Sequence, residues 1–562
     1  EISCSLVGSE MCIRDSSIPV RFFIALLIYF SWGPLAGGVV TAPVPEFSSP
    51  ALIPYPSKVV RGAGEAGFRS VQVKVGPDVP GRDDLMKEIK DIFRTSGIQG
   101  SLNSGGAAEG AMTWELFPDA RMKGEGYDLS VGLGKATVRA GSFGGFFNAL
   151  QTLRQLVFNR EGEFAMPVVR ISDKPAFVLR GVMLDVGRYY MSPALIKEVM
   201  RRLSRYKINT LHLHLTDDPA WRMEVKKYPA LTDGAFHWKS RLPGRFYTQA
   251  QLKDLTDYCA RLNIQVIPEI DMPGHSQPFA RAMKTGMQTE KGVSILKDVV
   301  DEAVSLFPGR FFHMGSDEAH ISMKDFIPRM AEHIRGKGKE VVVWSPGGPH
   351  DKDSVLMCWG ENEAGARMDK NMKRIDSNGF YIDWADSQSG VYQVFFQQPC
   401  EVPQGDDKAL GAIMPVWCDG NLSSERRVLE QYPFYPCALT FAERVWRGSA
   451  TKRRDYMAQL PPRGTDGWKE FREFEQRLAF HRDHFFQGVP FAYVKQADVA
   501  WSLVGPFDHR GKNDTSFEPE RRIAPSYRDG DRILAWKKTP VYGAAVHVLS
   551  LIHISEPTRL QL

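Results

Sequence analysis

The chain has 562 residues, of which 43% are hydrophobic and 24% are charged, a composition typical of about two to four globular domains. Its 71 basic and 66 acidic residues leave a net charge of only +5 and are interspersed, with no basic run. This charge pattern gives no support to nucleic-acid binding, and we expect none.

The two ends of the chain, residues 1–16 and 548–562, share no periodic pattern with the sequence beside them. Both resemble translated sequencing adapters, and we expect non-native tails, with genuine disordered tails as the alternative. Residues 17–42 carry Arg21 before an apolar stretch that is followed by small residues. They predict a signal peptide and a secreted or periplasmic protein. A short membrane anchor is the alternative, because this stretch is too short for a stable membrane span.

Residues 55–170 alternate strand-like and helical patterns. VQVKV (71–75) is typical of a strand, and DDLMKEIKDIFRTSG (83–97) is typical of a helix. A pair of strands and a second helix follow, in YDLSVGLGKATVRAG and GGFFNALQTLRQLV. This order predicts a small N-terminal α/β domain.

Residues 175–450 repeat a strand–helix alternation that predicts one (β/α)8 TIM barrel. An open doubly wound sheet is the alternative fold, but no glycine-rich phosphate turn follows the first strand. The expected strands are residues 179–185, 209–215, 264–270, 310–315, 340–344, 354–359, 379–383 and 412–417. We expect a helical extension over 451–489 and a partial β-rich domain over 490–547. The five cysteines between the tails form no CxxC pair and predict no disulfide framework.

Acidic and aromatic residues follow nearly every expected barrel strand. In barrel enzymes the carboxyl ends of the strands form the active site, so these side chains should converge on one pocket. Indole faces together with carboxylates that accept hydroxyl hydrogen bonds are typical of a sugar site. The strand-end residues are Asp185, Asp217, Asp218, Glu269, Asp271, His275, Asp317, Glu318, Trp344, Trp359, Tyr381, Asp383, Trp417 and Asp419.

The stretch HMGSDEAH (313–320) places two acids, Asp317 and Glu318, next to each other. Adjacent residues on a strand point to opposite faces, so this pair cannot flank one bond as two glycosidase acids usually do. The motif therefore needs a chemistry in which the two acids contact different atoms.

The chain resembles the β-N-acetylhexosaminidases of glycoside hydrolase family 20 over roughly residues 55–450. The resemblance rests on EGYDLSVGLGKATVRAGSFGGFFNALQTLRQL, LRGVMLDVGRYY, NTLHLHLTDDPAWR, VIPEIDMPGH, HMGSDEA, YIDWAD and LTFAERVW. It implies an exo-acting retaining enzyme that releases terminal β-linked N-acetylhexosamine and uses no cofactor or metal. In this family the acetamide of the substrate is the nucleophile, which explains the adjacent acids.

The resemblance also implies a role for each matching residue. Glu318 would be the general acid/base, kept protonated by burial against tryptophan faces, and Asp317 would stabilise the charged acetamide. The residues implied to bind or wall the sugar, or to support Glu318 as a polar relay, are Arg180, Asp383 and Asp419 (hydroxyls), Tyr381 (acetamide carbonyl), Trp344, Trp359 and Trp417 (walls), and Asp217 and His275 (relay).

The chain departs from the family pattern at three positions near these residues. Ser316 replaces a glycine, Pro219 replaces a glutamine, and Asp419 replaces a glutamate. The shorter Asp419 side chain leaves the preferred sugar epimer, GlcNAc or GalNAc, open. The natural glycan and the oligomeric state are open as well.

Two other functions compete with this interpretation. His212 and His214 form an H-x-H that a metal-dependent hydrolase could use, with His275, His313, Asp317 and His320 as further ligands. The more ordinary interpretation is that both are hydrogen-bonded core histidines. A secreted sugar-binding protein without catalysis is the third hypothesis, and the intact acid pair argues against it.

Overall fold

The protein is described here from a computed structural model. The described residues are 50–102, 110–160, 163–360, 368–382, 389–420, 422–430, 432–449, 461, 464–491, 493, 500–502, 526–529 and 532–534. All of them belong to one compact unit, Phe47–Leu562. The predicted terminal tails and signal peptide lie outside the described residues.

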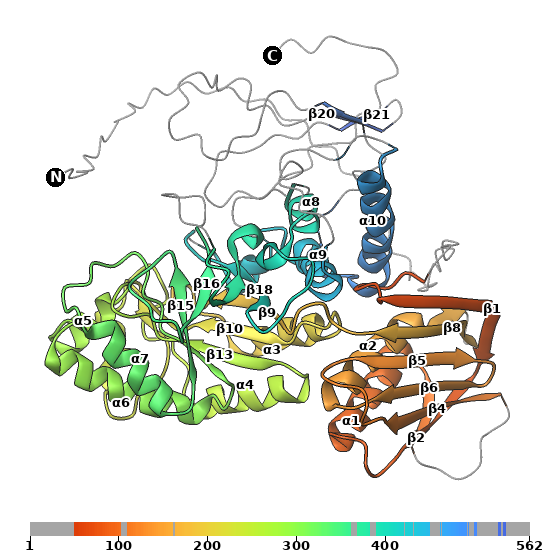
Figure 1. Cartoon of the computed structure of the whole chain (residues 1–562), viewed down its shortest axis with the longest axis horizontal. Helices are drawn as coiled ribbons and strands as arrows, with labels where there is room; N and C mark the ends of the chain where they lie inside the picture. Colours follow the sequence, from red (N-terminus) through yellow and green to blue (C-terminus); the bar gives the residue numbers. More distant parts are fainter. Residues whose placement is uncertain are drawn as a thin grey trace, which may run out of the picture. The chain divides into compact units, whose positions relative to one another are not determined.

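The N-terminal part is a mixed sheet of eight strands with two helices on one face (Figure 1). The helices are α1 (Arg82–Ser96) and α2 (Phe143–Leu156), and the Ser142 side chain caps α2 by accepting from the Gly145 N–H. The strand order is β1 (Lys58–Phe68), β8 (Glu163–Asp173), β5 (Tyr127–Gly132), β6 (Lys135–Ala140), β4 (Ala111–Pro118), β2 (Ser70–Val75) and β3 (Gln99–Leu102), with β7 (Phe158–Arg160) paired to β8.

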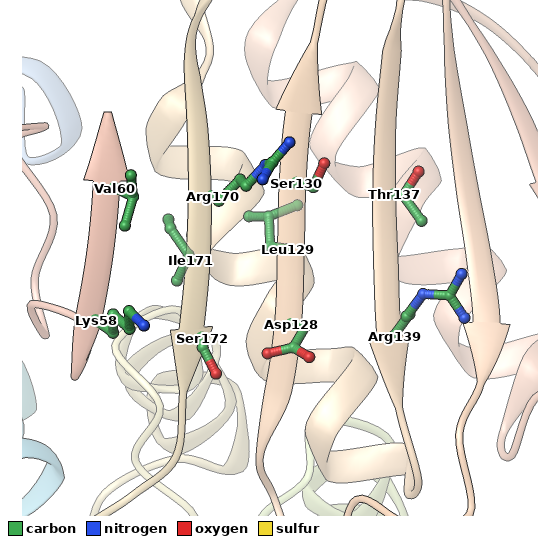
Figure 2. Close-up of a pocket in the computed structure, with 10 residues that line it drawn as sticks. All are labelled: Lys58, Val60, Asp128, Leu129, Ser130, Thr137, Arg139, Arg170, Ile171 and Ser172. Atoms are coloured by element: carbon green, nitrogen blue, oxygen red, sulfur yellow. The ribbon is translucent and has the colours of Figure 1, made fainter. Parts of the chain in front are cut away.

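The other face of this sheet is polar and carries a shallow groove of about 440 Å³ (Figure 2). Alternation along each strand explains the two faces, because successive side chains point to opposite sides. Arg170, Ser130 and Thr137 stand side by side on neighbouring strands and point into the groove. None of the groove residues is a predicted site residue, so the groove does not belong to the candidate active site.

Eight parallel strands form the predicted closed barrel. In order around the barrel they are β9 (Leu179–Asp185), β10 (Thr210–His214), β13 (Gln265–Glu269), β14 (Phe311–His313), β15 (Glu340–Ser345), β16 (Val355–Cys358), β17 (Lys373–Asp376) and β18 (Ala409–Val416). The helices between and after them are α3 (Pro193–Ser204), α4 (Gln249–Arg261), α5 (Gln277–Met283), α6 (Glu290–Leu306), α7 (Phe326–Gly336), α8 (Ser389–Phe395) and α9 (Phe434–Arg447).

The seventh strand is not where the sequence predicted it. The expected strand at 379–383 begins in a 3-10 helix, η3 (Asn378–Phe380), and the strand is the preceding segment Lys373–Asp376. This segment has a charged sequence, KRID, and gave no strand pattern. It is nevertheless buried, because the Arg374 side chain donates to the backbone carbonyls of Lys370 and Cys400.

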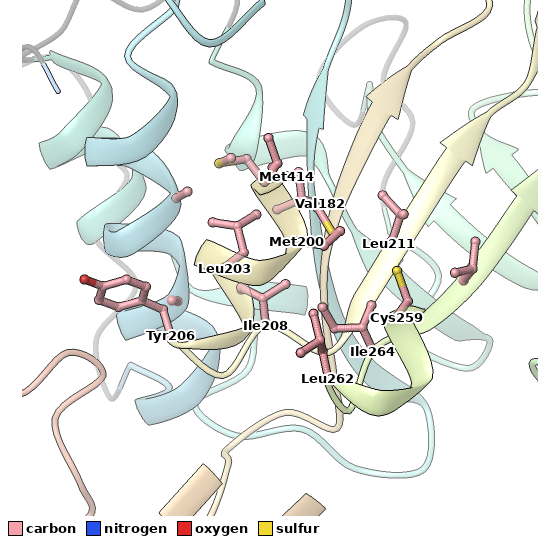
Figure 3. Close-up of a cluster of buried hydrophobic side chains, with 14 of the residues drawn as sticks. Val182, Met200, Leu203, Tyr206, Ile208, Leu211, Cys259, Leu262, Ile264 and Met414 are labelled. Carbon is pink, nitrogen blue, oxygen red and sulfur yellow. The ribbon is translucent and has the colours of Figure 1, made fainter. Parts of the chain in front are cut away.

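Alternation along the barrel strands separates an inner from an outer core. On β9, Met183 points into the barrel, whereas Val182 and Leu184 pack outward under the helices. Figure 3 shows the outer layer, where Val182, Leu211 and Met414 of three strands meet Met200 and Leu203 of α3. The same parity sends His212 and His214 of β10 into the barrel and Leu211 and Leu213 outward.

Two further parts follow the barrel. Helix α10 (Asp466–Phe485) lies within the predicted helical extension, and the β-rich prediction is represented by three short antiparallel strands, β19 (Ala500–Ser502), β20 (Ser526–Asp529) and β21 (Arg532–Leu534). Among the described residues, no helix combines the length and the apolar character needed to cross a membrane. The five cysteines of the described part are all buried.

Candidate active site

The two adjacent acids lie on a tightly turned loop after β14. Gly315, Ser316 and Glu318 all have positive φ values of 66°, 83° and 48°, which is uncommon for residues other than glycine. The turn leaves Asp317 half-buried, whereas the Glu318 side chain is 59% exposed. The expected burial of Glu318 against tryptophan faces is therefore absent in the unliganded chain.

His275 lies between Glu318 and a buried carboxylate. Its Nε2 atom is 3.5 Å from Oε2 of Glu318, and its Nδ1 atom is 3.5 Å from Oδ1 of Asp217. The nearby Asp217 carboxylate raises the pKa of His275 to about 9, against the effect of burial. The structure thus assembles the predicted relay Glu318–His275–Asp217, with an imidazole that is cationic at neutral pH.

The relay continues deeper than the sequence predicted. Asp217 Oδ2 lies 2.8 Å from His214 Nε2, and His214 Nδ1 lies 2.7 Å from Oε2 of Glu269. Glu269 also accepts from the Trp344 indole at 2.7 Å. Because both nitrogens of the buried His214 face carboxylates, its pKa is raised well above the usual value although burial opposes this. The sequence places Glu269 and His214 at or near the ends of strands, but it does not indicate that their side chains pair.

A half-buried arginine that the sequence analysis missed, Arg188, joins three acids at the same end of the barrel. Its guanidinium lies 3.1 Å from each of Asp185, Asp217 and Asp419 and stacks 4.7 Å above the Trp417 ring. Against the effect of burial, these carboxylates raise the pKa of Arg188. Arg188 follows the carboxyl end of the first barrel strand, and the strand-end rule applied to LDVGRYY could have identified it.

The sequence-based assignment of Arg180 to the sugar is contradicted by its position. Arg180 is the second residue of β9, at the amino end of the barrel, and shares the outward parity of Val182. It is fully buried, donates to the carbonyls of Phe177 and Lys207, and pairs with Glu125 of the N-terminal part at 2.5 Å. Its role is to join the barrel to the N-terminal sheet, and Arg188 takes its place at the candidate site.

The three predicted tryptophans lie at strand ends as expected, at different depths. Trp344 is fully buried, 5.8 Å from the Trp417 ring, whereas Trp359 and Trp417 are half-buried at the edge of the inner core. Trp359 is oriented by its indole N–H, which donates to Pro346. Trp344 is thus a floor beneath the site rather than an open wall.

The remaining predicted site residues differ in exposure, and one of them lies outside the described residues. Tyr381 follows η3 on the carboxyl side of β17 and is half-buried, and Asp383 lies outside the described residues. Asp419 keeps a 63% exposed side chain, and its loop is held by Arg241, which donates to the carbonyls of Cys418 and Gly420 at 2.8 Å. Partial loss of water around the carboxyl and the nearby Asp185 and Asp217 charges raise the pKa of Asp419, although Arg188 lowers it.

The histidines of the metal hypothesis are engaged with carboxylates instead. His212, Glu269 and His313 lie close enough together to hold an ion, but His212 Nε2 already faces Glu269 Oε2 at 2.8 Å. His313 Nδ1 accepts from the Gly315 N–H, and burial lowers the pKa of His212 to about 4. The described geometry favours a hydrogen-bonded core histidine at His214, whereas His212 meets Glu269 in a close contact without a hydrogen bond.

The assembled side chains suit the handling of a polar, hydroxyl-bearing ligand. An exposed carboxyl group beside a cationic imidazole can exchange a proton with a ligand atom. A half-buried second acid can face developing positive charge, and an arginine with paired carboxylates beside an indole ring can hold hydroxyl groups. A closed parallel barrel with such a set of residues at its carboxyl end defines a barrel hydrolase of the glycosidase type.

Comparison with known proteins agrees with this class. The family model "Glycosyl hydrolase family 20, catalytic domain" matches residues 177–291, and its "domain 2" matches residues 49–174. The chain is 30% identical to a β-N-acetylhexosaminidase of Cellulomonas fimi over 454 residues, covering 71% of the chain and 86% of the relative. The chain belongs to glycosyl hydrolase family 20.

Other relatives and solved structures give the same picture. A β-hexosaminidase of Porphyromonas gingivalis is 31% identical over 408 residues, 59% of this chain and 52% of the relative. The chain thus spans about half the length of that relative and 63% of a β-hexosaminidase of Vibrio furnissii. The fold matches the Streptomyces plicatus N-acetyl-β-hexosaminidase in complex with Thio-NAglucal, with a TM-score of 0.64, 23% identity and coverage of 81% and 98% of the two chains.

Proposed function

We propose that this protein is an exo-acting retaining β-N-acetylhexosaminidase that works by substrate-assisted catalysis. It releases terminal β-linked N-acetylglucosamine or N-acetylgalactosamine from glycans or glycoconjugates. The proposal is supported by family membership, by relatives with this activity in their names, and by the geometry of the two adjacent acids.

Glu318 is the general acid in this mechanism and protonates the oxygen of the leaving group. The acetamide oxygen of the substrate attacks the anomeric carbon from the other side and forms an oxazolinium-type intermediate. Glu318 then acts as the base that activates water. His275, supported by the Asp217 carboxylate, can pass a proton to Glu318 between its acid and base steps. A bound sugar covers the Glu318 carboxyl that is exposed in the free chain.

Asp317 serves the other end of the substrate. It is half-buried behind Glu318 and faces the acetamide, where its carboxylate stabilises the cation that forms on cyclisation. Tyr381 donates to the acetamide carbonyl and aligns it for attack. Such alignment supplies roughly 7–11 kcal/mol in well-oriented intramolecular reactions.

Arg188, its carboxylate partners and the tryptophans bind the terminal sugar in this proposal. Arg188 and Asp419 bind ring hydroxyls, and Asp383 binds a further hydroxyl. Trp359 and Trp417 wall the sugar ring above Trp344. These contacts require a free sugar end, which is why the proposed cleavage is at the terminus of the glycan.

One observation carries this proposal. His275 lies 3.5 Å from Glu318, and the neighbouring acid, Asp317, is not placed to act on the same glycosidic bond as Glu318. Turnover of chromogenic β-N-acetylglucosaminides and β-N-acetylgalactosaminides tests it. Hydrolysis of either, with no hydrolysis of the matching β-glucoside, is the expected result. Absence of turnover would leave a non-catalytic sugar-binding protein as the better description.

We also propose that the protein is secreted or periplasmic, and anchored at the surface if residues 17–42 are retained. The proposal is supported by the signal-peptide pattern of that segment. Expression with this segment and N-terminal sequencing of the exported product test it, and full retention inside the cell would contradict it.

A further inference from the structure

Asp271 is a fully buried acid directly behind the catalytic loop, and the proposed mechanism has not used it. It follows the carboxyl end of β13, and its backbone N–H donates to the Thr216 hydroxyl at 2.9 Å. The neighbouring N–H groups of Ile270 and Met272 donate to His313 and Met314, both at 3.1 Å. The backbone on both sides of Asp271 is therefore tied to the segment that leads into the two acids.

The side chain of Asp271 is packed against the turn that carries Asp317. A Cβ atom at Gly315 would lie only 1.8 Å from Oδ1 of Asp271, so only glycine allows this approach. The same oxygen accepts from the Ser316 N–H at 3.3 Å. The strained loop thus turns around the carboxyl group of Asp271.

This arrangement brings two carboxyl groups together in a buried place. One oxygen of Asp271, one oxygen of Asp317 and a nitrogen of His275 all lie within 4.8 Å of one another. Glu269 faces the pair from β13 and Glu318 lies on the Asp317 side, while His275 and His214 are the facing cationic groups. A buried carboxylate and a half-buried one at such a separation repel each other when both are ionised, which favours a proton on one of the two.

Burial decides which of the two acids holds this proton. Asp271 is 1% exposed, and burial followed by the Asp317 charge raises its pKa well above the usual range. Asp317 is half-buried, and burial followed by the Glu269 charge raises its pKa to about 7. Asp317 therefore ionises first, and it is the one of the two that faces the ligand side.

We propose that Asp271 is a positioning residue that keeps the proton of the Asp271–Asp317 pair, so that the negative charge resides on Asp317. As a neutral acid, Asp271 supports the Ser316 turn without competing for the cationic intermediate. The catalytic consequence rests on the proposed function, whereas the location of the proton in the free protein does not.

The first test detects the proton directly, by infrared difference spectroscopy of the unliganded protein at about pH 8.5, where Asp317, with a pKa of about 7, is ionised. We expect the carbonyl band of a protonated carboxylic acid in the wild type and in Asp317→Asn, and its loss in Asp271→Asn. Glu88→Gln is the matched control, because Glu88 is also buried but Arg154 and Arg201 lower its pKa against the effect of burial. A band that disappears in Asp317→Asn and persists in Asp271→Asn would overturn the proposal.

The second test reads the consequence for catalysis through the pH profile of kcat/KM. An amide mimics a neutral acid, so Asp271→Asn should move the acidic limb by less than about 0.3 pH units. If Asp271 instead carried the charge, its removal would shift that limb by roughly one unit or more to lower pH. If no hexosaminide is turned over, the proposed function fails, and the infrared result alone still decides where the proton lies.

Discussion

The Nε2 atom of His275 lies 3.5 Å from Oε2 of Glu318, so a cationic imidazole stands next to an exposed acid of the site. The distance is longer than a hydrogen bond, and such catalytic contacts often tighten only when substrate binds. Its other nitrogen faces Asp217, which makes His275 the connection between the exposed acid and the buried charges.

Glu318→Gln should lower turnover by about 10²- to 10⁴-fold for substrates with poor leaving groups, because the amide cannot protonate the departing oxygen. The leaving oxygen of aryl glycosides with acidic phenols needs less protonation, so their turnover should fall much less. A series of aryl N-acetylglucosaminides with graded phenol acidity measures this. Equal losses across the series would mean that Glu318 is not the acid.

His275→Ala should change the dependence of stability on pH. The folded-state pKa of about 9 lies above the unfolded value, so the protonated imidazole stabilises the fold fully below about pH 6.5. This contribution is lost as the pH rises through about 9. Urea unfolding of both proteins across this range should show a difference that shrinks with pH. The pH profile of turnover should also change shape, and parallel profiles would argue against the relay.

Arg188→Ala should lower activity, whereas Arg180→Ala should lower folding stability. Removing Arg188 deletes charged hydrogen bonds to the sugar of about 1.5–3 kcal/mol, and kcat/KM should fall by roughly 10- to 100-fold or more. Removing Arg180 deletes a fully buried guanidinium and leaves the half-buried Glu125 without its cationic partner, a change that should cost about 1–3 kcal/mol of folding stability.

The Arg180 variant that remains folded should keep a normal KM, and Arg180→Lys offers a milder test. Thermal unfolding and steady-state kinetics of both arginine variants decide the assignment. A raised KM for Arg180→Lys at unchanged stability would restore the original sequence-based role of this residue.

Asp317→Asn should lower turnover strongly, because it removes the charge opposite the cationic acetamide. Since the pKa of Asp317 in the free protein is about 7, wild-type kcat/KM should fall as the pH drops below this value. A thiazoline mimic of the cyclised intermediate should bind much more tightly than the product sugar, and less so to the variant. Trapping a covalent sugar ester on any carboxylate would contradict the mechanism.

Removal of metal ions should leave activity unchanged. Both nitrogens of His214 are hydrogen-bonded to Glu269 and Asp217, and Nε2 of His212 lies 2.8 Å from Glu269, so these three nitrogens are not free to bind a metal ion. Activity after exhaustive dialysis against a chelator, with and without added zinc, measures this. Loss on dialysis and recovery with a metal would revive the metal-dependent hydrolase.

The sequence by itself predicted the barrel, its order after an α/β domain, and most of the strand-end residues. It could do so because barrel strands are short buried apolar runs, and because the carboxyl ends of parallel strands meet at one face. Glu318, His275 and Asp217 were brought together as expected. The same reasoning failed for β17, where a charged segment forms the strand and the terminal nitrogens of its buried Arg374 donate to backbone carbonyls.

Only the tertiary structure decided where side chains point and which of them pair. Arg180 and Arg188 are alike in the sequence, but strand β9 ends between them, and its length places them at opposite ends of the barrel. The exposure of Glu318, the depth of Trp344 and the burial of Asp271 against Gly315 likewise depend on segments far apart in the chain. Charge and burial are properties of these assembled neighbours, so the protonation of the site could be derived only from the folded chain.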